Sequence, residues 1–131
     1  MTLWWQQCLL VMLGGALGAA GRFWLSGWLL RHVGNGFPWG TLSVNLIGSF
    51  AAGFFAIWLQ QRGPVGLYWR AFLIVGLIGG LTTYSALMIE CLLYGRSARG
   101  ELMLAYLLAS LAGGLLLVWL GARMAGLLRP F

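Results

Sequence analysis

The sequence contains very few charged residues and lacks two of their types altogether. Charged residues occupy 8% of its 131 positions, with no Lys and no Asp, and both acidic residues are Glu. Soluble domains carry about 25% charged residues, so an ordinary soluble protein is excluded. With no Asp and a single His, no catalytic constellation emerges, and we expect a protein that is not an enzyme. His32, in a predicted turn, is expected to be a solvated loop residue rather than a metal ligand.

Cysteine is also scarce. Cys8 and Cys91 both lie within apolar runs, and they do not have Cys-x-x-Cys spacing. Isolated cysteines of this kind behave as small hydrophobic residues inside a protein. We therefore expect neither a disulfide nor a metal-binding cysteine pair.

What the chain has in abundance is hydrophobic sequence. Hydrophobic residues make up 61% of the chain, and a membrane-spanning helix needs about 20 mostly apolar residues. Four such stretches are predicted, at about residues 3–30, 40–59, 68–94 and 101–128. The first lacks a charged leader and is too long for a signal peptide, so we expect it to be retained. The sequence predicts an all-α membrane protein, with one four-helix domain over residues 1–131.

The arginines are divided almost equally between the two expected membrane surfaces. The net charge of +6 comes from eight Arg, and in a membrane chain these are expected to meet lipid headgroups rather than nucleic acid. One surface has Arg62, Arg70, Arg123 and Arg129. The other has Arg31, Arg96 and Arg99, with Arg22 near it or within the span. Because arginine bias sets orientation, this balance predicts insertion both ways up and an antiparallel homodimer of the bilayer-embedded chain.

The third predicted helix contains an interruption. Three glycines, the last two at Gly79 and Gly80, are followed by Thr82, Thr83 and Ser85, all weak helix formers that compete for backbone hydrogen bonds. We expect a broken helix here, and unwound backbone at this depth must line a cavity or meet protein. Its carbonyls could bind a hard cation and its hydroxyls could line an anion path. Glycine-rich packing explains the segment equally well.

Other polar residues in the spans have two readings each. Thr41, Asn45 and Ser49 form one stripe on the second helix, since they recur every four residues. Asn45 could donate to an anion or join two helices. Arg22 could snorkel to the interface, create an electropositive mouth, or do both. Glu90 is either a proton carrier or a carboxylate paired with an arginine.

Three ordered motifs make the whole chain resemble the Fluc family of fluoride channels, also called CrcB. The first is Gly-x-x-Gly-Ala-x-x-Arg at residues 15–22, and the second is Gly-Thr-Leu-x-Val-Asn at residues 40–45. The third is Gly-Gly-Leu-Thr-Thr-Tyr-Ser at residues 79–85, followed by Glu90. Three motifs in order at the corresponding helices form a much more specific signal than any one glycine-rich stretch.

The resemblance implies a dual-topology homodimer in a bacterial inner membrane that passively exports cytoplasmic fluoride and reduces its toxicity. It also implies a structural sodium ion, not transported, held by the backbone carbonyls of Gly79 and Thr82. Arg22 corresponds to an anion-attracting vestibule. The implied fluoride path comprises Asn45, Thr83, Tyr84, Ser85, Leu87 and Ser110.

The chain departs from the family pattern at two places. The pattern Phe-Ser-Thr-Phe reads Tyr84 to Leu87 here, so the first aromatic ring is a tyrosine and the second is lost. On the fourth helix, Gly114 and Val118 follow Ser110 where further hydroxyl residues are common in the family. These departures keep open a non-conducting membrane subunit. A small multidrug-type exporter of dual topology is a further alternative, but it requires a carboxylate in the first helix, which is missing.

Overall fold

The computed structural model describes residues 3–128 and consists of four helical spans. The first span is α1 (Trp4–Val33) and the second is α2 (Trp39–Trp58). The third is divided into α3 (Gly63–Trp69), a π-helix η1 (Arg70–Ile78), α4 (Gly79–Leu81) and α5 (Tyr84–Arg96), and the last is α6 (Gly100–Leu127). All four spans are long and apolar enough to cross a membrane. The predicted all-α class with four spans is confirmed, and Arg129 lies outside the described residues.

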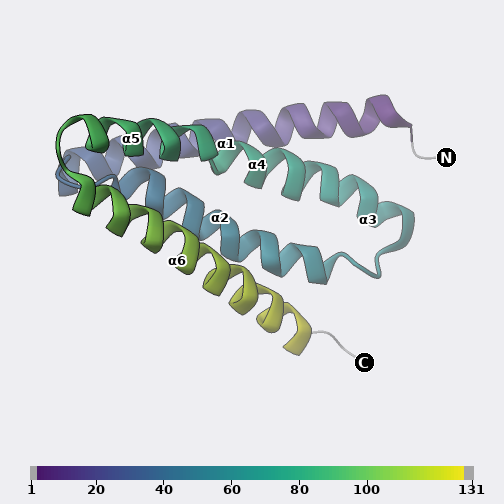
Figure 1. The fold of residues 1–131 in the computed structure, drawn as a ribbon. Helices are drawn as coiled ribbons and strands as arrows, with labels where there is room; N and C mark the ends of the chain where they lie inside the picture. Colours follow the sequence, from purple (N-terminus) through teal and green to yellow (C-terminus); the bar gives the residue numbers. More distant parts are fainter. Residues whose placement is uncertain (1–2, 129–131) are drawn as a thin grey trace.

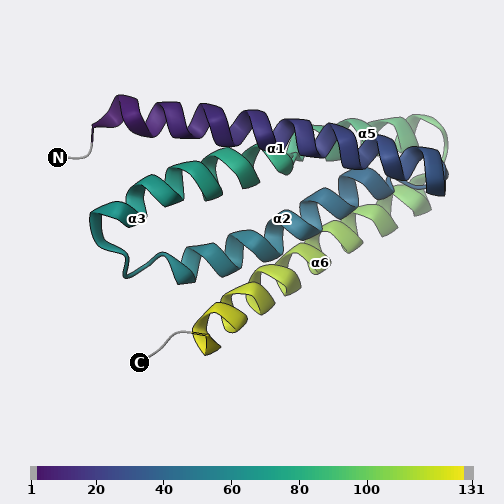
Figure 2. The same cartoon turned by 180° about the vertical axis from the view of Figure 1, so that it is seen from behind.

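The spans are arranged as two pairs that diverge along the bundle. α1 packs along η1 and α4, and α2 packs along α6. The pairs are close together where the turn after α1 and the turn after α5 lie, and they separate toward the other end, where α1 begins and α6 ends (Figures 1 and 2). Both helix ends that lead to the termini, together with the α2–α3 turn, therefore share one end of the bundle.

Glycines bring α1 and the third span into backbone contact. A Cβ placed on Gly14 or Gly18 would overlap backbone atoms of the third span, and one on Gly76 would lie 3.0 Å from the Cα of Gly14. The glycines are therefore spaced four residues apart on both helices, with Gly80 continuing the row. Lipid tails are as apolar as helix surfaces, so no hydrophobic force drives membrane helices together. They associate instead through close backbone packing of this kind. The small residues of α1 thus have the third span as their partner.

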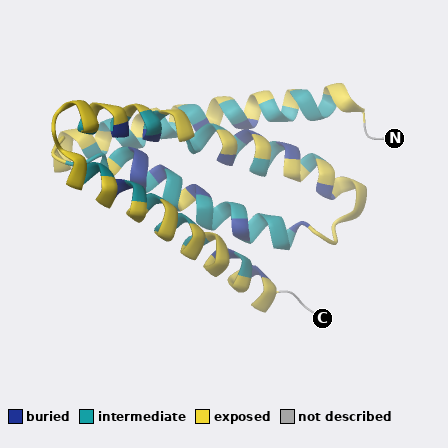
Figure 3. Ribbon diagram, viewed as in Figure 1, coloured by how far each residue is buried: buried dark blue, intermediate teal, exposed yellow. Residues whose placement is uncertain are grey.

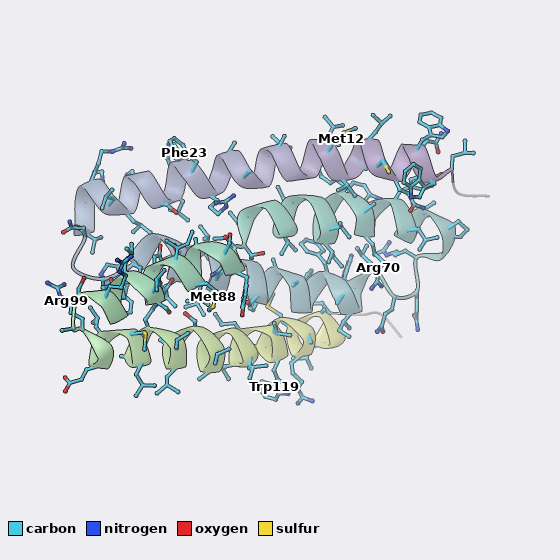
Figure 4. The ribbon with its side chains drawn as sticks, turned by 45° about the horizontal axis from the view of Figure 1, so that its top comes forward. Met12, Phe23, Arg70, Met88, Arg99 and Trp119 are labelled. Carbon is cyan, nitrogen blue, oxygen red and sulfur yellow. The ribbon has the colours of Figure 1, made fainter. Side chains whose placement is uncertain are left out.

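Few side chains are buried within the single chain. Val44, Tyr106 and Ala125 have no exposed surface, and a core cluster joins Leu42, Leu87, Cys91 and Tyr106. Long stretches of α1 and α6 are exposed (Figure 3). Large apolar side chains are among the exposed residues of both helices. Phe23 on α1 and Trp119 on α6 both project away from the bundle (Figure 4). Such a surface is suited to lipid or to another membrane protein. Both cysteines are free, and of the two only Cys91 is buried.

The third span is interrupted at Thr82 and Thr83. Both residues are extended, with φ/ψ of −85°/153° and −149°/120°, between α4 and α5. The predicted break is therefore present, and it is confined to two residues. The span itself begins at Gly63, earlier than residue 68, because Pro64 occupies the first turn of α3, where the missing N–H costs nothing.

Candidate functional site

The side chain of Asn45 binds both backbone groups of one residue in the helix break. Its Nδ2 donates to the carbonyl of Thr83 at 3.0 Å, and the N–H of Thr83 donates to its Oδ1 at 2.7 Å. The two groups that Thr83 loses on leaving the helix are thereby paired. Of the two readings of Asn45, the structure shows the bond between helices, and one further N–H of the amide is left to donate elsewhere.

Hydroxyl groups complete the local order of the break. The Oγ1 of Thr83 accepts from the N–H of Ala86 at 3.2 Å and so caps the start of α5. The same oxygen lies 3.3 Å from the Oγ of Ser85. Thr82 donates back to the carbonyl of Ile78 at 2.8 Å, which closes the end of α4. The hydroxyls of Thr83 and Ser85 therefore lie side by side at the break.

Arg22 of α1 contacts the same break. Its Nε donates to the carbonyl of Gly80 at 3.0 Å, across 58 residues of sequence, and the side chain is partly buried. Its guanidinium, and with it a positive charge, is thus held beside α4 at the break. Whether Arg22 snorkels or creates an electropositive mouth, the carbonyl of Gly80 is its hydrogen-bond partner.

Several carbonyl groups at the break and just before it have no hydrogen-bond partner among the described residues. Within the described residues, no hydrogen bond is made by the carbonyl oxygens of Gly79, Leu81 or Thr82, whereas that of Gly80 is taken by Arg22. Carbonyl oxygens are the ligands preferred by hard cations. Gly79 and Thr82 are the two positions at which the resemblance implies a sodium ion, and their donor chemistry fits one.

A cavity of about 320 Å³ lies against the break. Most of the predicted path residues line it, namely Asn45, Thr83, Tyr84 and Leu87, together with Thr82 and Ser49. Tyr84 is 76% exposed, so its ring forms an open edge of the cavity, while Leu87 is buried in the core cluster and meets the cavity as a wall. The cavity therefore gathers amide, hydroxyl and aromatic edge groups at one place inside a membrane span.

Glu90 joins three helices through hydroxyl groups. Thr41 of α2 donates to its Oε1 at 2.6 Å, and Tyr106 of α6 donates to its Oε2 at 2.5 Å. No arginine among the described residues forms an ion pair with it, so the expected arginine partner is replaced by two hydroxyls. Tyr106 was not singled out in the sequence. Its signal is the one phenol of a mostly apolar helix, in a chain where an intramembrane carboxylate needs donors.

A second cavity, of about 290 Å³, lies against Glu90. Its lining includes Ser26, Trp39, Thr41, Glu90 and Tyr94, near the turn after α1. Thr41 and Asn45 lie one turn apart on α2, so the polar stripe of that helix leads from the first cavity to the second. Ser49, the third member, donates to the carbonyl of Asn45 within its own helix.

The remaining predicted residues lie apart from the first cavity. The Oγ of Ser110 is buried and has no partner among the described residues, which is an uncommon state for a hydroxyl in a helix. His32 is exposed as predicted, but it lies in the last turn of α1 and not in a loop, because α1 continues to Val33. It stacks on Trp28 and contacts its carbonyl at 2.8 Å.

Comparison with known proteins identifies the family. The model of the family described as "CrcB-like protein, Camphor Resistance (CrcB)" matches residues 9–122. The chain belongs to the CrcB family. It is 59% identical over 123 residues to the fluoride-specific ion channel FluC of Xylella fastidiosa strain 9a5c, covering 94% of this chain and 86% of the relative. It is 43% identical over 123 residues to the fluoride-specific ion channel FluC of Thermus thermophilus, covering 94% of this chain and 96% of the relative.

Family membership confirms the resemblance drawn from the three motifs. The relative from Xanthomonas axonopodis pv. citri strain 306, also named fluoride-specific ion channel FluC, is 55% identical over 120 residues, covering 92% of this chain and 90% of the relative. These CrcB relatives are named as ion channels and not as enzymes. Together with four spanning-capable helices, they make this chain a multi-pass membrane protein.

Proposed function

We propose that this chain is a fluoride channel that passively exports cytoplasmic fluoride from a bacterium through the inner membrane. The observation that carries the proposal is the first cavity, where Asn45, Thr83 and Tyr84 meet at a helix break inside a chain whose relatives are fluoride-specific channels. Fluoride is small and strongly hydrated, so a path must replace its water with donors. The free amide hydrogen of Asn45, the hydroxyls of Thr83 and Ser85, and the ring edge of Tyr84 are such donors.

The path continues along α2 toward the second cavity. Its members are the first cavity, the Thr41–Glu90–Tyr106 cluster and the second cavity, in that order. The hydroxyls of Thr41 and Tyr106 point their hydrogens at Glu90, and an anion that passes must compete for them. Ser110, with its unpartnered buried hydroxyl, supplies a further donor on α6. Outward movement follows from chemistry, because hydrogen fluoride enters from acid, ionises at neutral pH and is driven out by the membrane potential.

The working unit is an antiparallel homodimer of dual topology. Among the described residues, Arg62, Arg70 and Arg123 lie toward one end of the bundle and Arg31, Arg96 and Arg99 toward the other, so the bias that orients a chain is balanced. The exposed ring of Tyr84 at the edge of the first cavity also supports a second copy, because one chain leaves that edge uncovered.

A sodium ion holds the two breaks together in this proposal. Its support is the pair of unpartnered carbonyls at Gly79 and Thr82. The ion supplies fixed positive charge between the subunits and is not transported. The neighbouring Arg22, bonded to Gly80, adds positive charge that draws anions toward the break.

Fluoride efflux from liposomes tests the proposal directly. Vesicles loaded with potassium fluoride and containing the purified protein should release fluoride when a potassium ionophore is added, at a rate at least about tenfold above empty vesicles. Chloride-loaded vesicles are the matched control for selectivity. Efflux equal to that of empty vesicles, with an intact dimer present, would rule out the channel and favour the non-conducting subunit. The multidrug-type exporter has no support, because the described part of α1 contains no carboxylate.

Removal of sodium should weaken the dimer. If the carbonyls of Gly79 and Thr82 from two subunits share one ion, its loss leaves them facing each other unpaired, and the monomer fraction at fixed dilution in detergent should rise several-fold. Size-exclusion chromatography in sodium buffer and in N-methylglucamine buffer at equal ionic strength measures this. An unchanged monomer fraction would contradict the sodium assignment.

Leu87→Phe should increase the rate of fluoride efflux by about two- to tenfold. Leu87 forms a wall of the first cavity, and a phenyl ring there would present its positive edge to the anion. Leu92→Phe, on the exposed surface of α5, is the control for the added bulk. Equal rates for wild type and Leu87→Phe would show that one ring, that of Tyr84, is sufficient.

A further inference from the structure

We propose that Asn45 and Arg22 are positioning residues that build the helix break within each subunit, before a partner subunit or a cation binds. The inference goes beyond the proposed channel function, because it concerns how the break is made and holds whichever ion passes. It also gives a structural part to two residues that the family resemblance implies as contacts or attractors of an anion.

Asn45 replaces the hydrogen bonds that the helix loses at Thr83. An extended residue inside a membrane span leaves its N–H and its carbonyl without helical partners, which is costly where no water is available. A primary amide carries a donor and an acceptor side by side, as a peptide group does. Both are used, at 3.0 Å and 2.7 Å, and both go to Thr83. Such a two-way match fixes the extended conformation more firmly than a single bond would.

Arg22 secures the other side of the break. Its Nε takes the carbonyl of Gly80, which a continuous helix would offer to the N–H of Tyr84. The approach is possible because Gly80 has no side chain. A Cβ there would lie 2.5 Å from the carbonyl oxygen of Gly15 and 3.0 Å from the N–H nitrogen of Ala19, one helical turn before Arg22. The break is therefore tied to α1 on one side and to α2 on the other.

All of these bonds lie within one chain. Their partners are 58 and 38 residues apart, so they form when the subunit itself folds. The carbonyls left over, at Gly79, Leu81 and Thr82, are then presented on a finished break. A cation or a second subunit binds to this preformed arrangement and is not needed to unwind the helix.

Three substitutions at Arg22 separate the bond from the charge. Counting from Cα, the Nε2 of glutamine occupies the place of the arginine Nε, so Arg22→Gln keeps a donor there and removes the charge. Arg22→Lys keeps the charge but has a methylene at that place, and Arg22→Met keeps neither. Hydrogen exchange of the amides of residues 82–86, in the full-length protein in nanodiscs, is the readout.

The proposal expects exchange in Arg22→Gln within about twofold of wild type, and exchange at least about tenfold faster in Arg22→Lys and Arg22→Met. If Arg22→Lys exchanged at the wild-type rate and Arg22→Gln exchanged fast, the effect would come from the charge, and the proposal would be overturned. Exchange unchanged in all three variants would overturn it as well.

Asn45 and sodium give independent tests. Asn45→Leu should accelerate exchange of residues 82–86 at least about tenfold, since Thr83 loses both partners. Ser49 lines the same cavity but bonds only within α2, so Ser49→Ala should not accelerate exchange. Wild-type protein in sodium-free buffer should keep its protection, and this measurement needs no variant to fold. Slow exchange in Asn45→Leu, or fast exchange in sodium-free wild type, would overturn the proposal. Failure of fluoride efflux alone would affect only the proposed function.

Discussion

Gly18→Ala should destabilise the subunit by about 3 kcal/mol, the upper range for overpacking a well-packed interior. A Cβ on Gly18 would overlap the carbonyl oxygen of Leu77 and lie 2.8 Å from the backbone nitrogen of Leu81. Backbone atoms cannot rotate away as a side chain can, so α1 must move off η1 and α4. The same movement would carry Arg22, one turn further along α1, away from Gly80, so the break should loosen together with the packing.

Gly27→Ala is the matched control on the same helix. The nearest atom to its Cβ is an arginine nitrogen of Arg31 at 3.8 Å, at the end of a flexible side chain. Alanine should therefore be neutral there, or stabilising by up to about 1 kcal/mol through its higher helix propensity. Unfolding midpoints in mixed micelles, followed by tryptophan fluorescence, compare the two variants. Equal midpoints for Gly18→Ala and Gly27→Ala would show that the close approach at Gly18 carries no strain.

The helices could be predicted because their signal is local. A run of about 20 apolar residues specifies a span regardless of its neighbours, and the row of small residues around Gly14 and Gly18 specifies a packed face. The start of the third span was predicted too late because Gly63 and Pro64 indicate a turn in isolation. In the chain they form the first turn of α3. The π-helical stretch from Arg70 to Ile78 has no signal of its own in composition.

The residues of the site could be predicted from the sequence, but their hydrogen-bond partners could not. The weak helix formers around Thr82 and Thr83 indicated the break, and the polar stripe on α2 indicated that Asn45 and Thr41 share a face. The partners of these residues depend on how the spans pack, so the bonds from Asn45 to Thr83 and from Arg22 to Gly80 are set by tertiary structure. The same holds for Glu90, where hydroxyls from two other helices take the place of an arginine.

Glu90→Leu should destabilise the subunit by about 2–5 kcal/mol, because it strands two buried hydroxyls. Tyr106 is fully buried, so its hydroxyl cannot turn to solvent, and Thr41 is only 8% exposed. Glu90→Gln should cost less, since its amide oxygen still accepts from one hydroxyl and its amide nitrogen can donate to the other. Glu101→Leu, at an exposed position in the first turn of α6, is the control for loss of a carboxylate.

A double-mutant cycle decides whether the cost of Glu90→Leu comes from the stranded hydroxyl of Tyr106. Tyr106→Phe removes that hydroxyl while keeping the ring that packs edge-on against Phe37. If the hydroxyl is the source, adding Tyr106→Phe to Glu90→Leu should recover about 1–2 kcal/mol of the unfolding free energy, because an apolar pair replaces an unpaired polar group. Strictly additive losses would instead place the cost in packing around residue 90. Fluoride efflux by the recovered double variant then separates stability from conduction: folded protein with efflux still reduced would make these donors part of the ion path as well as of the fold.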